Sequence, residues 1–201
     1  MQPAARERLL EAMLIELAAS GYDAMRVADV LTLSGVSKAD FEAEFGDKET
    51  CLFAAYEQLT ERLARKSTEG CGSGGEWPQR VRRGLEALLR ELAGAPAMAR
   101  VAIRTFPSIG PEARARYQDF VEGFASLLRE GREFSGMDEE LPAEVEMLAV
   151  GAAEAIVFEE IEAGRAAQLP AMGPAILFSV LVPFLGPEDA SAEMEKARQS
   201  E

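Results

Sequence analysis

Histidine and asparagine are absent from the sequence, and cysteine is scarce. Without histidine the chain has no Ser-His-Asp or Cys-His catalytic arrangement and no His-containing metal site, so we expect no metal and no cofactor. Cys51 and Cys71 are too few for a disulfide framework or a cysteine zinc site, which is typical of a reducing cytoplasm. The most apolar run, from Ala175, is short and contains Pro183, so we expect neither a signal peptide nor a membrane span. The sequence therefore predicts a soluble cytoplasmic protein.

Positive charge is also in short supply. The formal net charge is −14 over 201 residues, which argues against nonspecific coating of nucleic acid or of an anionic membrane. Residues 1–66 hold eight Lys/Arg against twelve Asp/Glu, a net charge of −4, and the remainder of the chain carries −10. A local DNA-reading surface in the less acidic third is still compatible with this distribution.

Apolar residues recur at helical spacing along nearly the whole chain, and no window alternates with period two for long enough to form a strand. The pattern predicts an all-α fold of about nine helices. We expect a first helix over 4–20, later helices over 142–164 and 173–185, and a polar tail over 188–201.

The stretch "SGVSKADFEAEFGDKE", residues 34–49, contains the signals of a helix start. Ser37 is a good N-cap, and Asp40 three residues later completes a capping-box pattern. Val36 and Phe41 fit a hydrophobic staple, and Phe41 with Phe45 places one helix face in a core. A short helix held on two others by a tight turn is the helix-turn-helix geometry, whose second helix reads the major groove.

The longer stretch "GYDAMRVADVLTLSGVSKADFEAEFGDKETCLFAAYE" resembles the N-terminal domain of TetR-like (TetR/AcrR-like) transcriptional regulators. The resemblance implies a three-helix helix-turn-helix domain over 1–47 and a larger helical ligand-binding and dimerisation domain over 48–187, with a linker near 67–77. It implies a DNA-binding homodimer that binds a palindromic operator in double-stranded DNA, is released by a small effector and commonly represses transcription. No enzymatic activity is implied.

The resemblance also implies which residues contact DNA. They are Arg26, Val27, Ala28, Ser37, Lys38, Ala39, Glu42 and Lys48. Glu42 and Glu44 depart from the family pattern, in which a Tyr is common at the first of these positions. Glutamate can only accept a hydrogen bond, for instance from cytosine N4. Arg26, Lys38 and Lys48, with Arg6 and Arg8, would supply the phosphate contacts, and Glu42 faces the DNA either as a base reader or as a repelling charge.

Two further sets of residues follow from the helical pattern and the family resemblance. Helices that are apolar on two sides predict a four-helix dimer interface formed by Leu148, Gly151, Ala152, Ala155, Phe178, Leu181 and Val182. A pocket for a mostly apolar effector is implied by the resemblance, with candidate lining residues Met98, Ile103, Phe106, Tyr117, Phe120, Phe124 and Phe158.

Other patterns favour alternative interpretations. "GCGSGG", residues 70–75, satisfies GxGxxG but follows a helix end and precedes "EWP", so a flexible connector is favoured over a dinucleotide site. A carboxylate enzyme would draw on Glu154, Glu159, Glu160 and Glu162, for which a solvated helix face is the better interpretation. A regulator-like scaffold that has lost DNA binding, and binds only a ligand or a protein, is favoured by Glu42 and Glu44.

Overall fold

Helices form all of the regular structure in the described part of the chain. The computed structural model describes residues 1–135 and 141–199, and within these ranges it has nine α-helices and no strand, which confirms the predicted all-α class. The α-helices are α1 (Pro3–Ser20), α2 (Val27–Ser34), α3 (Lys38–Glu44), α4 (Lys48–Cys71), α5 (Trp77–Gly94), α6 (Pro96–Arg100), α7 (Pro111–Leu128), α8 (Val145–Glu162) and α9 (Leu169–Arg198). Shorter π and 3-10 elements are η1 (Val101–Thr105), η2 (Phe106–Ser108), η3 (Arg129–Phe134) and η4 (Ala166–Gln168).

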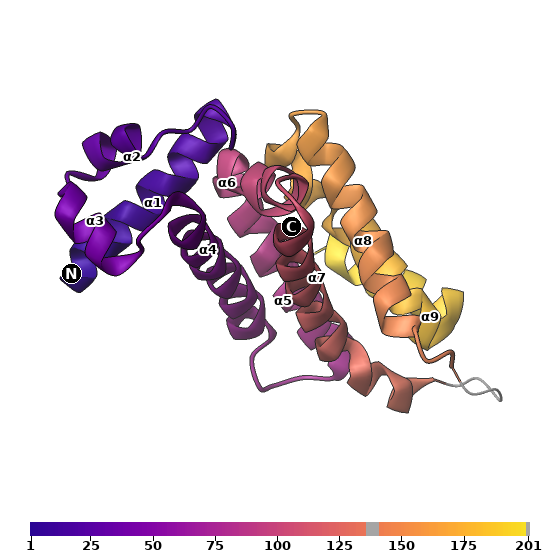
Figure 1. The fold of residues 1–201 in the computed structure, drawn as a ribbon. Helices are drawn as coiled ribbons and strands as arrows, with labels where there is room; N and C mark the ends of the chain where they lie inside the picture. The colour runs from indigo at the N-terminus through magenta and orange to yellow at the C-terminus, as the bar shows by residue number, and fades with distance from the viewer. Residues whose placement is uncertain (136–140, 200–201) are drawn as a thin grey trace. The chain divides into compact units, whose positions relative to one another are not determined.

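These elements form two compact units. The first contains residues 1–62 and 97–117, and the second contains 63–96 and 118–201. Figure 1 labels the helices of both units. The units are not divided at residue 47 or at residue 187, so the functional domain limits expected from the sequence stay predictions.

The first unit is built on α1 and on the first half of α4. One face of α1 is fully buried and includes Leu9, Met13 and Leu17, and α2 packs against this helix. Gly35 ends α2 in the left-handed region, with φ 67° and ψ 20°, a conformation that glycine adopts without steric cost. The chain can therefore turn sharply and begin α3 three residues later.

An aromatic cluster joins α4 to η1 and η2 within the first unit. The rings of Tyr56 and Phe106 stack with centroids 3.5 Å apart, and Phe53 meets Phe106 edge-on at 5.6 Å. Tyr56 Oη donates a hydrogen bond to the carbonyl of Ala102 at 3.0 Å. Burial raises the pKa of Tyr56, so its hydroxyl stays protonated and can serve as this donor. The π-helix η1 is thereby tied to α4.

The core of the second unit surrounds Trp77, which is 2% exposed. Its ring packs against Phe184 of α9 and Phe134 of η3, at centroid distances of 5.3 Å and 5.6 Å. A Cβ at Gly131 would lie 2.5 Å from the indole ring, so only glycine permits this approach. α9 also packs against both α5 and α8.

The connector expected over 67–77 is shorter and better held than the sequence suggests. α4 continues to Cys71, because Gly70 in its last turn lets the helix approach Ala87 and Arg83 of α5 closely. The remaining residues, 72–76, are held by side chains of α5. Arg83 donates to the carbonyls of Cys71 and Gly74, and Arg80 donates to that of Gly75.

The polar tail expected over 188–201 is helical in most of its described part. α9 is interrupted at Gly186, with φ 75° and ψ 171°, and then continues as a helix to Arg198. Ala190, Glu193 and Ala197 of this second segment are buried, so it packs rather than trailing from the chain. Residues 200 and 201 lie outside the described residues.

By length and composition, one described helix, Ala166–Arg198, could cross a membrane. However, 44% of its most apolar window is buried inside the protein, and the helix is broken at Gly186. A buried core helix of a soluble protein meets the same criteria, so α9 is only weak evidence for a membrane span.

Candidate DNA-reading surface, dimer face and ligand pocket

α3 begins where the capping signals place it. Ser37 Oγ accepts a hydrogen bond from the backbone N–H of Asp40 at 3.1 Å and donates to the Asp40 carboxylate at 2.6 Å. Phe41 is buried, and its ring lies 6.2 Å from that of Phe45. Asp40 is therefore occupied in forming the cap, and the opposite side of α3 is exposed to solvent.

Most of the predicted DNA-contact residues are surface residues. Arg26, Ala28, Ser37, Lys38, Ala39 and Glu42 are exposed, whereas Val27 and Lys48 are half-buried. Two of the exposed cations are already paired: Arg26 Nε lies 2.8 Å from Asp29 Oδ2, and Lys38 Nζ lies 3.4 Å from Glu42 Oε1. The side chains of Arg26 and Lys38 remain 75% and 77% exposed, so solvent reaches both pairs.

Lys48 and Arg8 are bound to backbone carbonyls. Lys48 Nζ donates to the carbonyls of Tyr22 and Met25, at 2.9 and 3.3 Å, and lies 4.1 Å from the centroid of the Tyr22 ring. Arg8 Nε donates to the carbonyl of Ser34 at 3.2 Å, at the end of α2. These two cations order the turns around α2, so they are less available to DNA than the sequence suggests.

Two further acidic residues near α3, Glu44 and Asp47, also have local partners. Glu44 accepts from the N-terminal amine of Met1 and pairs with Arg6, both at 3.4 Å. Asp47 Oδ1 accepts from the N–H of Thr50 at 2.8 Å, and this hydrogen bond lowers the pKa of Asp47. Each of the five Lys and Arg side chains in residues 1–48 therefore has a partner within the chain.

α8 exposes the predicted interface residues Leu148, Gly151, Ala152 and Ala155. Leu148 is 66% exposed and the neighbouring Met147 is 40% exposed, the first a high value for a leucine. On α9, Phe178 and Val182 are half-buried. Leu181 is 0% exposed, so its side chain packs inside the protomer and is not available to a second copy.

The predicted effector-pocket residues are divided between the units. Met98, Ile103 and Tyr117 are half-buried in the first unit, where Phe106 is fully buried against Tyr56 and acts as core. Phe120, Phe124 and Phe158 are half-buried in the second unit, with the rings of Phe120 and Phe124 edge-on at 5.0 Å.

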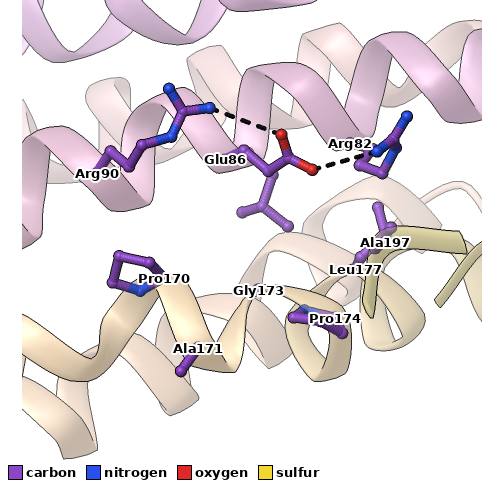
Figure 2. A pocket seen from close by; sticks show the side chains of 10 residues that line it. Arg82, Glu86, Arg90, Pro170, Ala171, Gly173, Pro174, Leu177 and Ala197 are labelled. Carbon is purple, nitrogen blue, oxygen red and sulfur yellow. Dashed lines mark hydrogen bonds and ion pairs between the residues drawn. The ribbon is translucent and has the colours of Figure 1, made fainter. Parts of the chain in front are cut away.

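The second unit contains a pocket of about 520 Å³ between α5 and α9, and none of these residues lines it. Its lining comprises Arg82, Leu85, Glu86, Arg90, Pro170, Ala171, Gly173, Pro174, Leu177 and Ala197. Figure 2 shows the carboxylate of Glu86 between the two arginines on α5, opposite Pro170 and Pro174 of α9. The sequence signal that could have located this site is the spacing of Arg82, Glu86 and Arg90 at i, i+4 and i+8. The apolar pattern of the same helix does not indicate a pocket.

Groups suited to catalysis are poorly placed in the described residues. Glu160 pairs with Arg165 at 2.7 Å, and this hydrogen bond lowers the pKa of Glu160, the opposite of what a general acid needs. Burial raises the pKa of the Cys51 thiol to about 12, so it is not a nucleophile at neutral pH. Within residues 1–135 and 141–199, no group of three or more Cys, Asp or Glu side chains could hold a metal ion.

No protein-family model and no curated protein matches the sequence. Solved structures match it over most of their length. The fatty acid degradation regulator FadR from Bacillus halodurans has a TM-score of 0.77 and 17% identity, over 87% of this chain and 97% of that one. FadR from Bacillus subtilis, in complex with stearoyl-CoA, has a TM-score of 0.67 and 17% identity, over 90% and 98%.

A third match is the TetR-family regulator PfmR from Thermus thermophilus, with a TM-score of 0.65 and 23% identity over 88% of this chain and 95% of that one. At these identities the likeness concerns the fold. The chain has the fold of TetR-family transcriptional regulators, as its N-terminal sequence predicts.

Proposed function

We propose that the protein is a homodimeric, ligand-responsive transcriptional regulator that binds a palindromic operator in double-stranded DNA through α3. Repression is the mode we expect, and the cytoplasm is the compartment. The observation that carries the proposal is the structure of residues 1–48, which we call the α1–α3 head. In it, α3 is capped by Ser37 and anchored by Phe41, and its outer side exposes Lys38, Ala39 and Glu42. A short helix presented in this way fits the reading helix of a helix-turn-helix protein.

The phosphate contacts would come mainly from Arg26 and Lys38. Both side chains are more than 70% exposed, and exposed ion pairs contribute little to stability, so phosphates can replace Asp29 and Glu42 as partners. Lys48 would act indirectly, by holding the turn that positions α2. A dimer doubles this small set of contacts, so we expect weak affinity with strong dependence on salt.

The second copy would bind along α8. Its exposed side presents Leu148 next to the small residues Gly151, Ala152 and Ala155, which allow two helices to approach closely. Phe178 and Val182 of α9 would complete the interface. Two-fold symmetry would then place two copies of α3 on half-sites one helical turn apart.

A small effector with a mostly apolar body would release the DNA. The pocket between α5 and α9 has a volume typical of small-molecule sites, and one protein with this fold is described in complex with stearoyl-CoA. The effector can act only if it binds more tightly to a dimer conformation whose heads no longer match the half-sites.

A second candidate function is a regulator-like scaffold that binds a ligand or a protein but no DNA. The observation that favours it is that all five cations of residues 1–48 already have partners within the chain, three of them carboxylates and two of them backbone carbonyls. Glu42 and Glu44 add negative charge to the α3 side of the head.

Selection of bound sequences from a random double-stranded DNA library, at low and at moderate salt, separates the two candidates. A two-fold symmetric consensus is the result expected of the regulator, whereas no enrichment at either salt concentration would exclude it and leave the scaffold. The variant Glu42→Ala refines the test. If Glu42 reads a base, the variant loses preference at one position of each half-site, and if Glu42 repels the duplex, the variant binds all sequences more tightly.

A further inference from the structure

A row of three charged residues on α5 faces the first turns of α9 (Figure 2). Arg82, Glu86 and Arg90 are spaced four residues apart, so they lie on one side of the helix. Arg82 Nη1 lies 3.5 Å from Glu86 Oε1, and Arg90 Nη2 lies 3.6 Å from Glu86 Oε2. Two guanidinium groups against one carboxylate give the row a net positive charge, in a chain whose formal net charge is −14.

The ion pair of Arg90 leaves room for another anion. Its separation of 3.6 Å exceeds the roughly 2.7–2.9 Å of a close charge-assisted hydrogen bond, so Glu86 reduces the charge of Arg90 without binding it closely. Each guanidinium carries several N–H donors in a planar fork that matches a carboxylate or a phosphate. Arg90 is 65% exposed, so a ligand can reach it from solvent.

The opposite wall of the pocket is apolar. It consists of Pro170, Pro174, Leu177 and Ala197 of α9, and Leu85 of α5 adds a further apolar side chain to the lining. Proline has no backbone N–H, so the first turns of α9 have fewer donors to offer a polar ligand. One wall therefore suits a negative charge, and the other suits a hydrocarbon.

We propose that this α5–α9 pocket takes a small amphiphile with one anionic head group, a carboxylate or a phosphate monoester. The head group binds Arg90, and the apolar body packs against Pro170, Pro174 and Leu177. This assignment rests on the proposed function, because it identifies the pocket as the effector site of the regulator. A cationic head group would meet the net positive row, and a neutral one would gain nothing from it.

The position of the pocket also suggests how binding reaches the dimer. The lining residues Pro174 and Leu177 are on the same helix as Phe178 and Val182, which belong to the proposed interface. Ala197 comes from the segment after the break at Gly186, so that segment forms part of the pocket wall. A ligand that shifts α9 therefore acts on the interface helix directly.

Calorimetric titration of the full chain with four ten-carbon probes tests the assignment. Decanoate and decyl phosphate carry the two candidate head groups, and decanol and decyltrimethylammonium are the neutral and cationic comparisons. We expect at least one of the two anions to bind one site per chain about tenfold or more tightly than decanol does. Preference for one anion identifies the head group, whereas equal or tighter binding of decanol or of the cation overturns the proposal.

Two variants locate the site. Arg90→Gln should weaken binding of the preferred anion about tenfold and leave decanol unchanged, because the substitution removes only the charged partner of the head group. Arg65→Gln is the matched control: Arg65 is 64% exposed and also pairs with a glutamate four residues away, Glu69, but does not line the pocket. Ala171→Trp, at an exposed position of the lining, should fill the pocket and weaken every probe. Unchanged anion binding in Arg90→Gln, with its melting temperature also unchanged, overturns the proposal.

Failure of this inference differs from failure of the proposed function. If the anion binds through Arg90 but the library selection yields no DNA consensus, the pocket assignment holds and the DNA-binding function fails. If a DNA consensus is found and Arg90→Gln binds the anions like the parent protein, the regulator holds and the pocket assignment fails.

Discussion

The α1–α3 head and helix α8 differ in which of their large apolar side chains are exposed. In the head, the large apolar residues Leu9, Met13 and Phe41 are buried, and charged side chains pair with one another on the outside. On α8, Val145 and Val157 are buried, but Leu148 and Met147 are exposed beside a row of small residues. The head exposes single large apolar side chains such as Leu33, whereas α8 exposes Leu148 and Met147 next to each other, which supports the proposal that a second copy of the chain covers them.

The largest expected effect comes from placing a charge on the exposed side of α8. Leu148→Asp would bury two unpaired carboxylates in the proposed dimer, at a cost on the order of 3–5 kcal/mol each. The dimer dissociation constant should then rise by about ten thousandfold or more, measured by sedimentation equilibrium.

Leu33→Asp is the matched control for this experiment. Leu33 is also an exposed leucine, 53% against 66% for Leu148, but it lies on α2 in the head. The variant should sediment like the parent protein. An equal loss of dimer in both variants, or a parent protein that is monomeric throughout, would remove the distinction between α8 and the head.

The next effect concerns the buried core of the α1–α3 head. Phe41→Ala removes a side chain that is 3% exposed and should destabilise the head by about 3–5 kcal/mol. Amides in residues 1–47 should exchange with deuterium much faster, while sedimentation stays that of a dimer. Phe134→Ala, at a ring that is 41% exposed, serves as the comparison and should cost far less. Loss of the dimer in Phe41→Ala would mean that the two regions do not act separately.

The head could be predicted from the sequence because its signals are local. Ser37, Asp40, Val36 and Phe41 lie within six residues, and the N-cap bond that they predict is present at 3.1 Å. The partners of Glu44 and Lys48 could not be predicted. Glu44 pairs with Arg6 and Lys48 binds carbonyls near residue 22, and contacts this far apart in sequence follow from how the helices pack.

The second unit is harder to predict for the same reason. Helical spacing locates α8 and α9, but the pocket arises where the charged side of α5 meets the prolines of α9, some eighty residues later. The apolar pattern cannot show that Leu181 points inward while Leu148 points outward, since both helices are apolar on more than one side. The helix after Gly186 is not predicted because its exposed residues are mostly polar.

A smaller effect concerns the buried side of α8, where Glu146 forms an ion pair with Arg132. Glu146 is 7% exposed and is held by Arg132 at 2.5 Å, and this hydrogen bond lowers the pKa of Glu146 below its ordinary value of 4.5. A lowered pKa means that the carboxylate stabilises the fold fully above pH 4.5, and that this stabilisation is lost as the pH falls through the pKa of the folded state.

Glu146→Gln should therefore reduce the free energy of unfolding at pH 7 by on the order of 2 kcal/mol, and the difference from the parent protein should shrink in acid. Urea titrations at several pH values measure both quantities. A difference that stays constant down to low pH would mean that the charge of Glu146 does not contribute. Glu159→Gln, at an exposed position of the same helix, should leave stability nearly unchanged at every pH.

The smallest effect concerns which cations of the head face DNA. Arg26 is exposed and donates hydrogen bonds to the neighbouring Asp29, whereas Lys48 donates to the carbonyls of Tyr22 and Met25. If Arg26 binds a phosphate in each half-site, Arg26→Gln should reduce the slope of log affinity against log salt by about one unit for each phosphate that is no longer neutralised. Lys48→Gln should lower the melting temperature and the affinity for all sequences but leave the slope unchanged, because its charge orders a turn instead of releasing counterions. Filter-binding titrations over a salt series, with the selected consensus DNA, measure both slopes. A reduced slope in Lys48→Gln together with an unchanged slope in Arg26→Gln would reverse the two roles and place the phosphate contact at the start of α4.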